Sequence, residues 1–565
     1  MNTPLSQDTN FTFSQYSLQH ILNTAWMQGT ALMLLCACIL FINIDGWDLW
    51  LPDQPRYAQV AREMLKTGDY LVPHLGAKVY PNKPPLFFWL IAICSMPYGD
   101  VTPASARLPS AFATLGVVLS TYFLGRKLYN SLTGFVAGLI LFTGIEFFWL
   151  ATRAQIDMTL TLWTTLALLL FYCGYTGKKF NSAYYLLSYL FMGLAVLTKG
   201  PVGFLIPLIA IFLFFTAKRE FRKFKEINLF KGLLIVLGTV SLWLVPACIM
   251  AGADYTQNIL LIQNLGRVKN SFSHRAPFYY YLIHFPRDFL PWSLFIPSAV
   301  VYFWRERHRG TLSNLLFPGA WFIGGFIFFS FISSKRDLYL LPLYPAAALL
   351  MARFWYENAI CGKTEPQKSY PPLLRGTLHL FFGVLMVCSI GIPVGYLLKL
   401  HFVDDLGLPG DILYCMSVFT FCAGAVGNIF TFNKKNVILP LSVIMVTIAL
   451  LFLCIVLMVF PSKNAGNSPR PFFERVEKTV SPEDTLVYYS IDHSLFYFLK
   501  RSPVPDMQTY SEIKQTLSTP RKVYCLLEEK DYKNAPEEIK LQTKICDEGM
   551  FGHQKYYLVL KRPAK

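Results

Sequence analysis

The sequence predicts a mainly α-helical, polytopic membrane protein with a small soluble α/β domain at its C-terminal end. Three observations predict this class: an apolar excess, apolar runs long enough to cross a bilayer, and a change of composition near residue 461. Hydrophobic residues make up 54% of the 565 residues and charged residues 15%, whereas soluble proteins carry about 25% charged residues. This composition largely excludes a cytosolic enzyme, a disordered protein and a secreted disulfide scaffold.

Apolar runs recur along residues 1–460, which we interpret as one transmembrane domain. A spanning helix needs about 20 mostly apolar residues, and by that rule we count about thirteen runs, several of them short. The link Lys199-Gly200-Pro201 separates two of them and predicts a tight hairpin or a break in one long segment. The runs lie at about 26–44, 107–125, 132–151, 158–176, 182–198, 200–217, 231–251, 290–304, 313–332, 338–355, 376–398, 411–432 and 437–460.

Basic residues predict the orientation of the chain. Lys and Arg number 51 against 34 Asp and Glu, which gives a formal net charge of +17. They form short clusters between apolar runs, so they indicate membrane orientation and we expect no nucleic-acid partner. The positive-inside rule places these clusters and the N-terminus in the cytoplasm. The clusters include Arg126-Lys127, Lys178-Lys179, the run from Lys218 to Lys225, and Lys434-Lys435.

The opposite, outer side is predicted to carry the function and the C-terminal domain. Two large outer loops, at about 46–106 and 252–289, hold most of the clustered polar and aromatic residues. Residues 461–565 begin with a Pro/Asn/Ser linker and continue as a charged, mixed segment. Cys525 and Cys546 in this segment would be able to pair in an oxidising compartment. Strand-like runs lie at Thr485–Ser490, Lys522–Leu527 and Tyr556–Leu560.

Asp53 is the first candidate for chemistry, because Pro52 and Pro55 restrict the backbone around it. The segment Pro55–Leu65 has the pattern of an amphipathic helix lying along the membrane surface. A structural role is also open: Asp53 would cap this helix, since Asp is a preferred N-cap residue. Both roles are compatible.

Other charged residues of the outer face are further candidates for chemistry. Asp157 stands at the outer start of the fourth run, and Lys199 stands alone between two apolar runs. A charge inside or at the edge of the membrane is costly and indicates function, although each cation would also be explained as a solvated or snorkelling residue. Two carboxylates suit a general base and an orienting partner, and several cations suit phosphate groups. The residues therefore predict a site that binds a lipid phosphate and activates a hydroxyl or an anion.

Several motifs of the outer face carry a resemblance to a known family. They are Pro52-Asp53-Gln54-Pro55-Arg56-Tyr57, Arg62-Glu63-Met64, Gly68 to His74, Asn82-Lys83-Pro84-Pro85, Asp157, Leu197 to Pro201, Ala276 to Tyr281, Leu290-Pro291-Trp292, and Lys335 to Pro342. With these motifs the chain resembles membrane glycosyltransferases of the protein O-mannosyltransferase and aminoarabinose-transferase superfamily, with the GT-C fold. It is most similar to the bacterial undecaprenyl-phosphate aminoarabinose:lipid A transferase (ArnT-like) type.

The resemblance implies roles for individual residues. Asp53 would be the principal catalytic carboxylate and Asp157 a second acidic residue in the same cavity. Lys83, Lys199 and Arg267 would bind the donor phosphate, which removes the need for a metal, so we expect metal-independent chemistry. The cavity would be lined by Arg56, Tyr57, Tyr80, Lys335, Arg336 and Tyr339. Gln54 and Asn82 stand where the family commonly has glutamate, which puts in doubt a second base and a metal site there.

The resemblance also implies a reaction and a location. A sugar, 4-amino-4-deoxy-L-arabinose or a related one, would pass by inverting displacement from a polyprenyl phosphate to lipid A or another envelope glycan or protein. The enzyme would lie among the lipids of the bacterial inner membrane, with its active site and C-terminal domain in the periplasm. A protein O-glycosyltransferase is the first alternative and a polytopic transporter the second; the one-sided clustering of polar groups and the lack of inverted repeats disfavour the transporter. A membrane receptor would leave the carboxylates and cations without a role.

Overall fold

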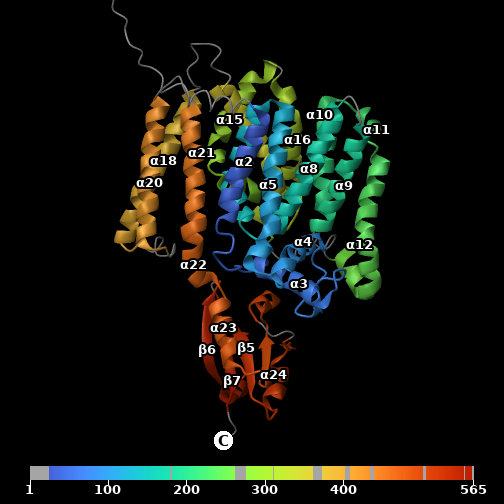
Figure 1. The fold of residues 1–565 in the computed structure, drawn as a ribbon, viewed down its shortest axis with the longest axis vertical. Coiled ribbons are helices and arrows are strands. Elements are labelled where there is room, and N and C mark those ends of the chain that lie inside the picture. The colour runs from blue at the N-terminus through green and yellow to red at the C-terminus, as the bar shows by residue number, and fades with distance from the viewer. Residues whose placement is uncertain are drawn as a thin grey trace, which may run out of the picture.

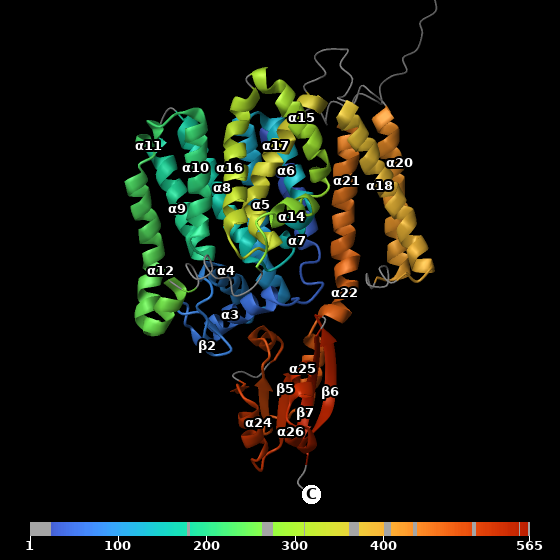
Figure 2. The ribbon, with the colours of Figure 1, turned by 180° about the vertical axis from the view of Figure 1, so that it is seen from behind.

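The computed structural model is a helical bundle with a small sheet domain attached to one end (Figure 1). The helices of the bundle stand roughly side by side, and Figure 2 shows the same arrangement from behind. The structure describes residues 24–177, 181–260, 262, 275–309, 311–360, 372–400, 408–432, 438–499, 504–552 and 554–562.

The described residues contain 8 helices that are long and apolar enough to cross a membrane, so the protein is a multi-pass membrane protein. A bent pair adds a ninth candidate: α6 (Ser131–Phe142) and α7 (Ile145–Ala151) meet at 72°. Three more apolar helices, α2 (Ala25–Phe41), α4 (Leu86–Ser95) and α10 (Val202–Lys218), are shorter. The predicted count of thirteen spans therefore stays a prediction. The 8 spans are α5 (Pro103–Leu128), α8 (Ile156–Thr176), α12 (Leu229–Gln257), α16 (Thr311–Phe331), η5 (Asp337–Leu343) with α17 (Tyr344–Trp355), α18 (Pro372–Leu397), α20 (Gly410–Phe432) and α21 (Ile438–Cys454).

Burial separates a central group of helices from a peripheral one. The apolar window of α5 is 67% buried and that of the span containing α17 is 78% buried, whereas those of α12 and α18 are only 17% buried. An apolar helix that exposes most of its surface is stable only in lipid. The central helices therefore form the protein core, and α12 and α18 present apolar faces to the membrane.

The link at Gly200-Pro201 forms a tight hairpin, one of the two predicted outcomes. α9 (Asn181–Lys199) ends before it and α10 begins at Val202. Gly200 has φ +92°, a conformation that favours glycine over residues with a Cβ. Lys199 is thereby held at the end of α9, on the side of the bundle that carries the first outer loop.

The first outer loop folds over this end of the bundle. α3 (Asp53–Thr67) confirms the predicted amphipathic helix and starts two residues earlier. The capping alternative is wrong, because Pro52 holds the N-cap position and Asp53 already lies in the first turn. A two-stranded hairpin follows, β1 (His74–Leu75) and β2 (Lys78–Val79), before α4 returns to the bundle.

The C-terminal residues form a five-stranded mixed sheet in the order β4-β3-β5-β7-β6. The three predicted strands correspond to β3 (Thr485–Tyr489), β5 (Val523–Glu528) and β7 (Gln554–Lys561). β4 (Asp506–Met507) is too short for a sequence signal, and β6 (Thr543–Phe551) is a largely exposed edge strand. Cys525 and Cys546 are free, because β7 lies between the strands that carry them.

The predicted linker is mostly helical. α22 (Phe460–Asn467) continues from the last span, and α23 (Arg470–Thr479) follows after a short break. Arg470 donates two hydrogen bonds of 2.7 Å to Asp48, and the Ser468 hydroxyl donates a third, also of 2.7 Å. These bonds attach the start of the C-terminal domain to the loop that precedes α3.

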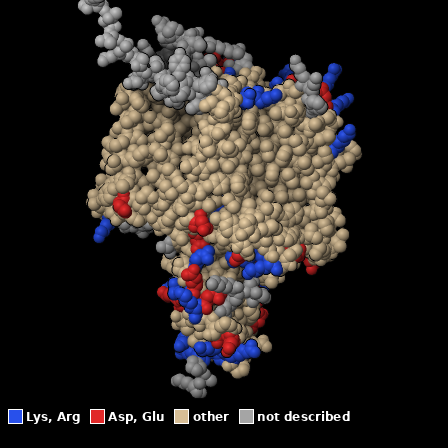
Figure 3. Space-filling model, in the orientation of Figure 1, with Lys and Arg blue, Asp and Glu red and all other residues tan. Residues whose placement is uncertain are grey.

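Lys and Arg residues gather at the end of the bundle that lies opposite the C-terminal domain (Figure 3). Figure 3 shows Lys and Arg at the end opposite the C-terminal domain, next to a broad band of uncharged residues. The basic helix α11 (Lys223–Glu226) lies at that end (Figure 1). This distribution agrees with the orientation predicted from the positive-inside rule, which stays a prediction.

Candidate active site

Two neighbouring cavities lie between the first outer loop and the bundle, at the end that faces the C-terminal domain. The larger, which we call the polar cavity, has a volume of about 340 Å³ and is lined by Asp53 and several cations. The smaller, which we call the lysine cavity, has a volume of about 210 Å³. Residues 334–339 form part of both walls: Ser334 and Tyr339 line the lysine cavity, and residues 335–338 line the polar one.

The loop before α3 is fixed by an arginine of α5. Arg107 is 1% exposed and donates hydrogen bonds of 2.6–2.8 Å to the carbonyl oxygens of Ile44, Trp47 and Asp48. Its guanidinium also lies 4.3 Å from the ring centre of Trp47. A buried arginine with this many partners rigidifies the backbone around it. The loop that leads into α3 is therefore fixed, and with it the position of Asp53 at the start of the helix.

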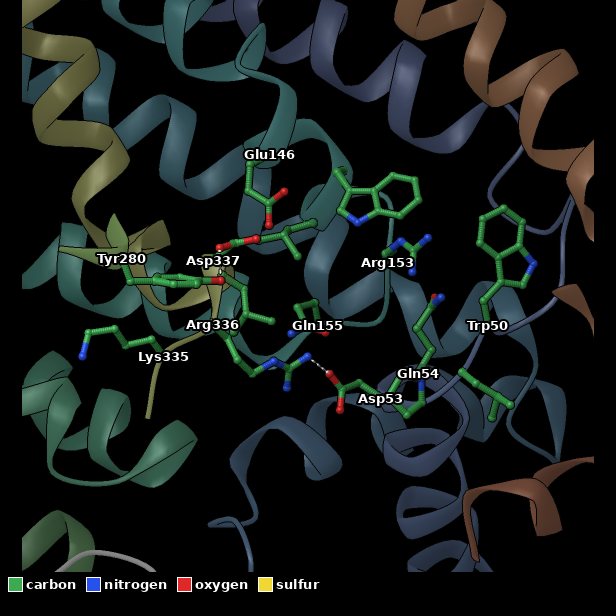
Figure 4. Close-up of a pocket in the computed structure, with 15 residues that line it drawn as sticks. Trp50, Asp53, Gln54, Glu146, Arg153, Gln155, Tyr280, Lys335, Arg336 and Asp337 are labelled. Carbon is green, nitrogen blue, oxygen red and sulfur yellow. Dashed lines mark hydrogen bonds and ion pairs between the residues drawn. The ribbon is translucent and has the colours of Figure 1, made fainter. Parts of the chain in front are cut away.

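Asp53 is held at the polar cavity by two arginines. Arg336 Nη2 donates to Asp53 Oδ2 at 2.8 Å, the contact drawn in Figure 4, and Arg56 Nη1 lies 3.5 Å from Oδ1. The Asp53 side chain is 12% exposed, so it reaches the cavity without being freely solvated. Burial alone would lower the pKa of Arg336, but the charge of Asp53 raises it above its usual value. This pair fixes the direction of the Asp53 carboxylate.

Aromatic residues and a third arginine form another wall of the polar cavity. The Arg153 guanidinium lies 3.5 Å from the ring centre of Trp149 and 5.2 Å from that of Trp50. Glu146, on the same helix as Trp149, also lines the cavity. Cation–π contacts of this kind orient a guanidinium without consuming its hydrogen-bond donors. Arg153 is thus placed to meet an anionic group.

A buried ion pair lies next to the lysine cavity. Lys199 Nζ contacts Asp157 Oδ1 directly, and Gln155 Nε2 donates to Asp157 Oδ2 at 3.2 Å. The Asp157 side chain is 1% exposed, and Lys199 Nζ also lies 4.3 Å from the ring centre of Tyr339. Lys83 lines the same cavity, together with apolar residues of α10 and α16. Two lysines beside an apolar wall match a phosphate attached to a hydrocarbon chain.

Comparisons with known proteins show what the chain is similar to. The model of the dolichyl-phosphate-mannose-protein mannosyltransferase family matches residues 82–245. An undecaprenyl phosphate-alpha-4-amino-4-deoxy-L-arabinose arabinosyl transferase from Yersinia enterocolitica is 31% identical over 374 residues. A protein of the same name from an Enterobacter species is 30% identical over 373 residues. The crystal structure of ArnT from Cupriavidus metallidurans bound to undecaprenyl phosphate superposes with a TM-score of 0.75 at 19% identity, over 95% of this chain and 98% of that one.

This chain is ArnT-like. The predicted GT-C fold is confirmed by the superposition, which extends through the C-terminal domain. The sequence match spans 65% of the length of the Yersinia relative and 66% of the Enterobacter one.

The structure brings most of the predicted site residues of the ArnT-like chain together. Asp53, Lys335 and Arg336 line the polar cavity, and Lys83, Lys199 and Tyr339 line the lysine cavity. Asp157 connects to the second group through Lys199. Lys335 Nζ donates to the carbonyl oxygens of Ala276 and Ile332, so it fixes the wall between the cavities. Arg267 lies outside the described residues.

Three of the predicted lining residues have other surroundings. Arg56 extends to Asp492 in the C-terminal domain, with its Nη2 2.7 Å from Oδ2. Tyr57 and Tyr80 are buried and both pack against Phe88 of α4, with ring centres 6.0 and 6.2 Å apart. Through these contacts, Tyr57 of α3 and Tyr80 both pack against α4.

Gln54 has a structural contact at the place where the family has glutamate. Its Oε1 accepts hydrogen bonds from the backbone N–H of Ala154 at 3.2 Å and from Arg107 Nε at 3.4 Å. Gln54 therefore connects the start of α3 to the segment between α7 and α8. A neutral amide is sufficient for this contact.

Sequence reasoning missed part of the polar cavity. Glu146 and Trp149 belong to the apolar run 132–151 and were not singled out, although a carboxylate inside such a run is a signal of function. Tyr280 and Asp337, which belong to motifs of the resemblance but had no role assigned to them, also line the cavity, where the Tyr280 hydroxyl donates to Asp337 Oδ1 at 2.6 Å. Among the described residues, no group of three or more His, Cys, Asp or Glu side chains is arranged to hold a metal ion.

Proposed function

We propose that the protein is an inner-membrane glycosyltransferase that moves 4-amino-4-deoxy-L-arabinose, or a related sugar, from a polyprenyl phosphate to lipid A or another envelope acceptor. The observation that carries this proposal is the pair of cavities separated by residues 334–339, one holding Asp53 and the other two lysines. The names of the arabinosyl transferase relatives and the undecaprenyl phosphate bound to the solved ArnT support the choice of donor.

The lysine cavity receives the donor phosphate. Lys83 and Lys199 supply two positive charges, and Leu205, Phe328 and Phe329 supply an apolar wall for the first isoprene units. The charge of the phosphate increases as it leaves the sugar, so cations fixed in advance stabilise the transition state more than the ground state. Asp157 holds Lys199 in direction through their ion pair. Arg267 of the second outer loop is proposed as a third donor ligand.

The reaction is a single inverting displacement. The acceptor oxygen attacks the anomeric carbon, the bond between that carbon and the phosphate oxygen breaks, and the polyprenyl phosphate leaves with the electron pair. If the acceptor is a phosphate of lipid A, it is already anionic, and Asp53 orients it or the amine of the sugar. If the acceptor is a hydroxyl, Asp53 accepts its proton as general base. The polar cavity, with Arg153 in its wall, receives the acceptor.

The first test is mass spectrometry of lipid A from cells with and without this gene. Loss of an amino-sugar substituent that returns with the wild-type gene, but not with Asp53→Asn, supports the proposal. The matched control is Asp254→Asn, which changes an exposed carboxylate at the end of α12 and is expected to restore the substituent fully. An Asp53→Asn variant with full activity would contradict the catalytic assignment.

A protein hydroxyl is the second candidate acceptor. The family match over residues 82–245 favours it, because that model describes protein mannosyltransferases. Lipid A that is identical with and without the gene would shift the search to envelope proteins. Labelled donor incubated with membranes and separated into lipid and protein fractions distinguishes the two acceptors.

The N-terminus is proposed to be cytoplasmic, with the active site and the C-terminal domain in the periplasm. This orientation is supported by the basic helix α11 at the end of the bundle opposite the site. Cysteine labelling of intact cells at exposed positions of the C-terminal domain tests it.

A further inference from the structure

We propose that Asp492 of the C-terminal domain is a positioning residue for Asp53 and acts through Arg56. This inference rests on the proposed function, because it assumes that Asp53 takes part in the transfer. It assigns the C-terminal domain a part in the chemistry, which takes place in the transmembrane domain.

Arg56 is the physical connection between the two carboxylates. It lies one turn along α3 from Asp53, and its two terminal nitrogens point to different partners. Nη2 contacts Asp492 Oδ2 at 2.7 Å, whereas Nη1 lies 3.5 Å from Asp53 Oδ1. A charge-assisted hydrogen bond between an arginine and a carboxylate is normally about 2.7–2.9 Å long. Arg56 thus forms a short contact with Asp492 and only a long one with Asp53.

Asp492 is itself fixed in place. It is the N-cap of the short helix η9 (His493–Phe498), and its Oδ1 accepts a 2.9 Å hydrogen bond from the Ser494 N–H. Burial alone would raise the pKa of Asp492, but the charge of Arg56 and the Ser494 hydrogen bonds hold it below its usual value. Asp492 is therefore an anchored anion that retains Arg56.

The long contact leaves one oxygen of Asp53 available. Asp53 Oδ2 accepts the short hydrogen bond from Arg336, so Oδ1 is the oxygen left to meet the acceptor or the sugar amine. Without Asp492, Arg56 has no competing anion and closes onto Oδ1. A second short ion pair would occupy Oδ1, so neither oxygen of Asp53 would be left to meet the acceptor or the sugar amine. Asp492 prevents this closure.

The contact between the domains does not depend on Asp492 alone. Arg62 of α3 donates to the Tyr497 carbonyl oxygen at 2.6 Å, and its guanidinium lies 4.4 Å from the Tyr497 ring centre. Lys78 forms an ion pair with Asp506 elsewhere in the same interface. Removing the charge of Asp492 is therefore expected to leave the domain in place. Asp506 supplies a matched control, because it belongs to the same interface but pairs with Lys78 and His493 instead of Arg56.

The test is steady-state kinetics of the full-length protein in detergent, with aminoarabinosyl polyprenyl phosphate as donor and lipid A as acceptor. Asp492→Asn is expected to lower kcat by about tenfold to a hundredfold, since a 1 Å misplacement of a reacting group costs about a hundredfold, with KM within about twofold of wild type. Asp492→Glu is expected to recover most of the loss. Asp506→Asn is expected to keep the wild-type kcat, and thermal unfolding confirms that all three variants are folded.

Each outcome has a separate meaning. Equal kcat values for Asp492→Asn and Asp506→Asn would overturn the positioning role, and an inactive Asp53→Asn beside them would leave the proposed function intact. Full activity of Asp53→Asn would contradict the catalytic role of Asp53 and the inference with it. A wild-type protein inactive with this donor and acceptor would contradict the proposed function and, because the inference depends on it, the role of Asp492.

Discussion

At the scale of single residues, the site is organised by charge pairs of different exposure. Asp157 and Lys199 form a pair whose side chains are 1% and 11% exposed, whereas Arg56 and Asp492 are 25% and 42% exposed. Breaking a buried pair leaves an uncompensated charge in an apolar environment, which costs far more than breaking an exposed pair. The two pairs therefore predict different responses to substitution.

Asp157→Asn is expected to lower the free energy of unfolding by about 3–5 kcal/mol, because it leaves the Lys199 ammonium buried without its partner. The double variant Asp157→Asn/Lys199→Gln removes both charges and is expected to recover most of this stability, while remaining inactive because the donor phosphate has lost a ligand. Thermal unfolding in detergent and the transfer assay measure the two effects. A double variant no more stable than the single one would count against the ion pair as the cause.

Metal independence is a second prediction at this scale. Asn82 replaces a carboxylate common in the family, and the lysines are expected to carry the phosphate charge instead. Incubation with EDTA, followed by removal of the chelator, is expected to leave kcat unchanged. A large loss of kcat that Mg²⁺ or Zn²⁺ restores would show that a divalent ion belongs to the site.

Site residues were predictable where their neighbours in the sequence give a signal, and not where the contact joins distant residues. Asp53 was recognisable because neighbouring prolines restrict it, and Asp157 because a charge at the edge of an apolar run is costly. Glu146 carried the same local signal within a longer apolar run and was missed. The contact between Arg56 and Asp492 joins residues 436 positions apart, and no local pattern indicates such a pair.

At the scale of elements, close helix packing requires glycine where α5 crosses α6. A Cβ built on Gly134 would lie 2.4 Å from the Tyr122 carbonyl oxygen and 2.8 Å from the Arg126 nitrogen. Both are backbone atoms, so neither helix is able to relieve the clash by turning a side chain. The crossing of these two central helices thus depends on the missing side chain.

Gly134→Ala is expected to destabilise the protein by about 1–3 kcal/mol through this overpacking. Gly238→Ala is the matched control: it lies within α12, and nothing lies within 4 Å of the added Cβ. The control is expected to be neutral, or stabilising by up to about 1 kcal/mol through helix propensity. Thermal unfolding compares the stability of the two variants, and equal changes of the melting temperature would contradict the packing argument.

Elements were predictable to the extent that their periodicity was clear. The hairpin at Gly200-Pro201, the amphipathic helix α3 and three strands of the sheet followed from the sequence. The edge strand β6 was not predicted, because its residues do not alternate clearly between apolar and polar. Helix α22 was not predicted either, because its segment contains Pro and Asn, which are poor helix formers. Tertiary contacts, such as those of Asp48 with Arg470, determine structure there.

At the scale of the whole molecule, the two parts of the chain are joined by ion pairs that include Arg56 with Asp492 and Lys78 with Asp506. Burial alone would raise the pKa values of both aspartates, but their cationic partners hold these pKa values below the usual range. A carboxyl group with a depressed pKa stabilises the folded state above its unfolded pKa, about 3.9 for aspartate, and this contribution is lost as the pH falls through the folded pKa.

The melting temperature is therefore expected to change little through these two groups between about pH 5 and 7 and to fall below about pH 4. Thermal unfolding of the full-length protein across this range measures the effect. The double variant Asp492→Asn/Asp506→Asn lacks both carboxyl groups. Its melting temperature is expected to fall less steeply with decreasing pH than that of wild type. Identical profiles for the two proteins would exclude these pairs as a source of acid sensitivity.

The apolar cluster beneath α3 has a consequence for how the protein is made. Tyr57 and Met64 of α3 belong to the same buried cluster as Leu495, Phe496 and Tyr497 of the C-terminal domain. During translation, α3 is made well before the residues that complete its cover, because 435 positions separate Arg62 of α3 from Tyr497. The apolar face of α3 therefore stays incompletely covered at the membrane surface until the C-terminal domain has been synthesised.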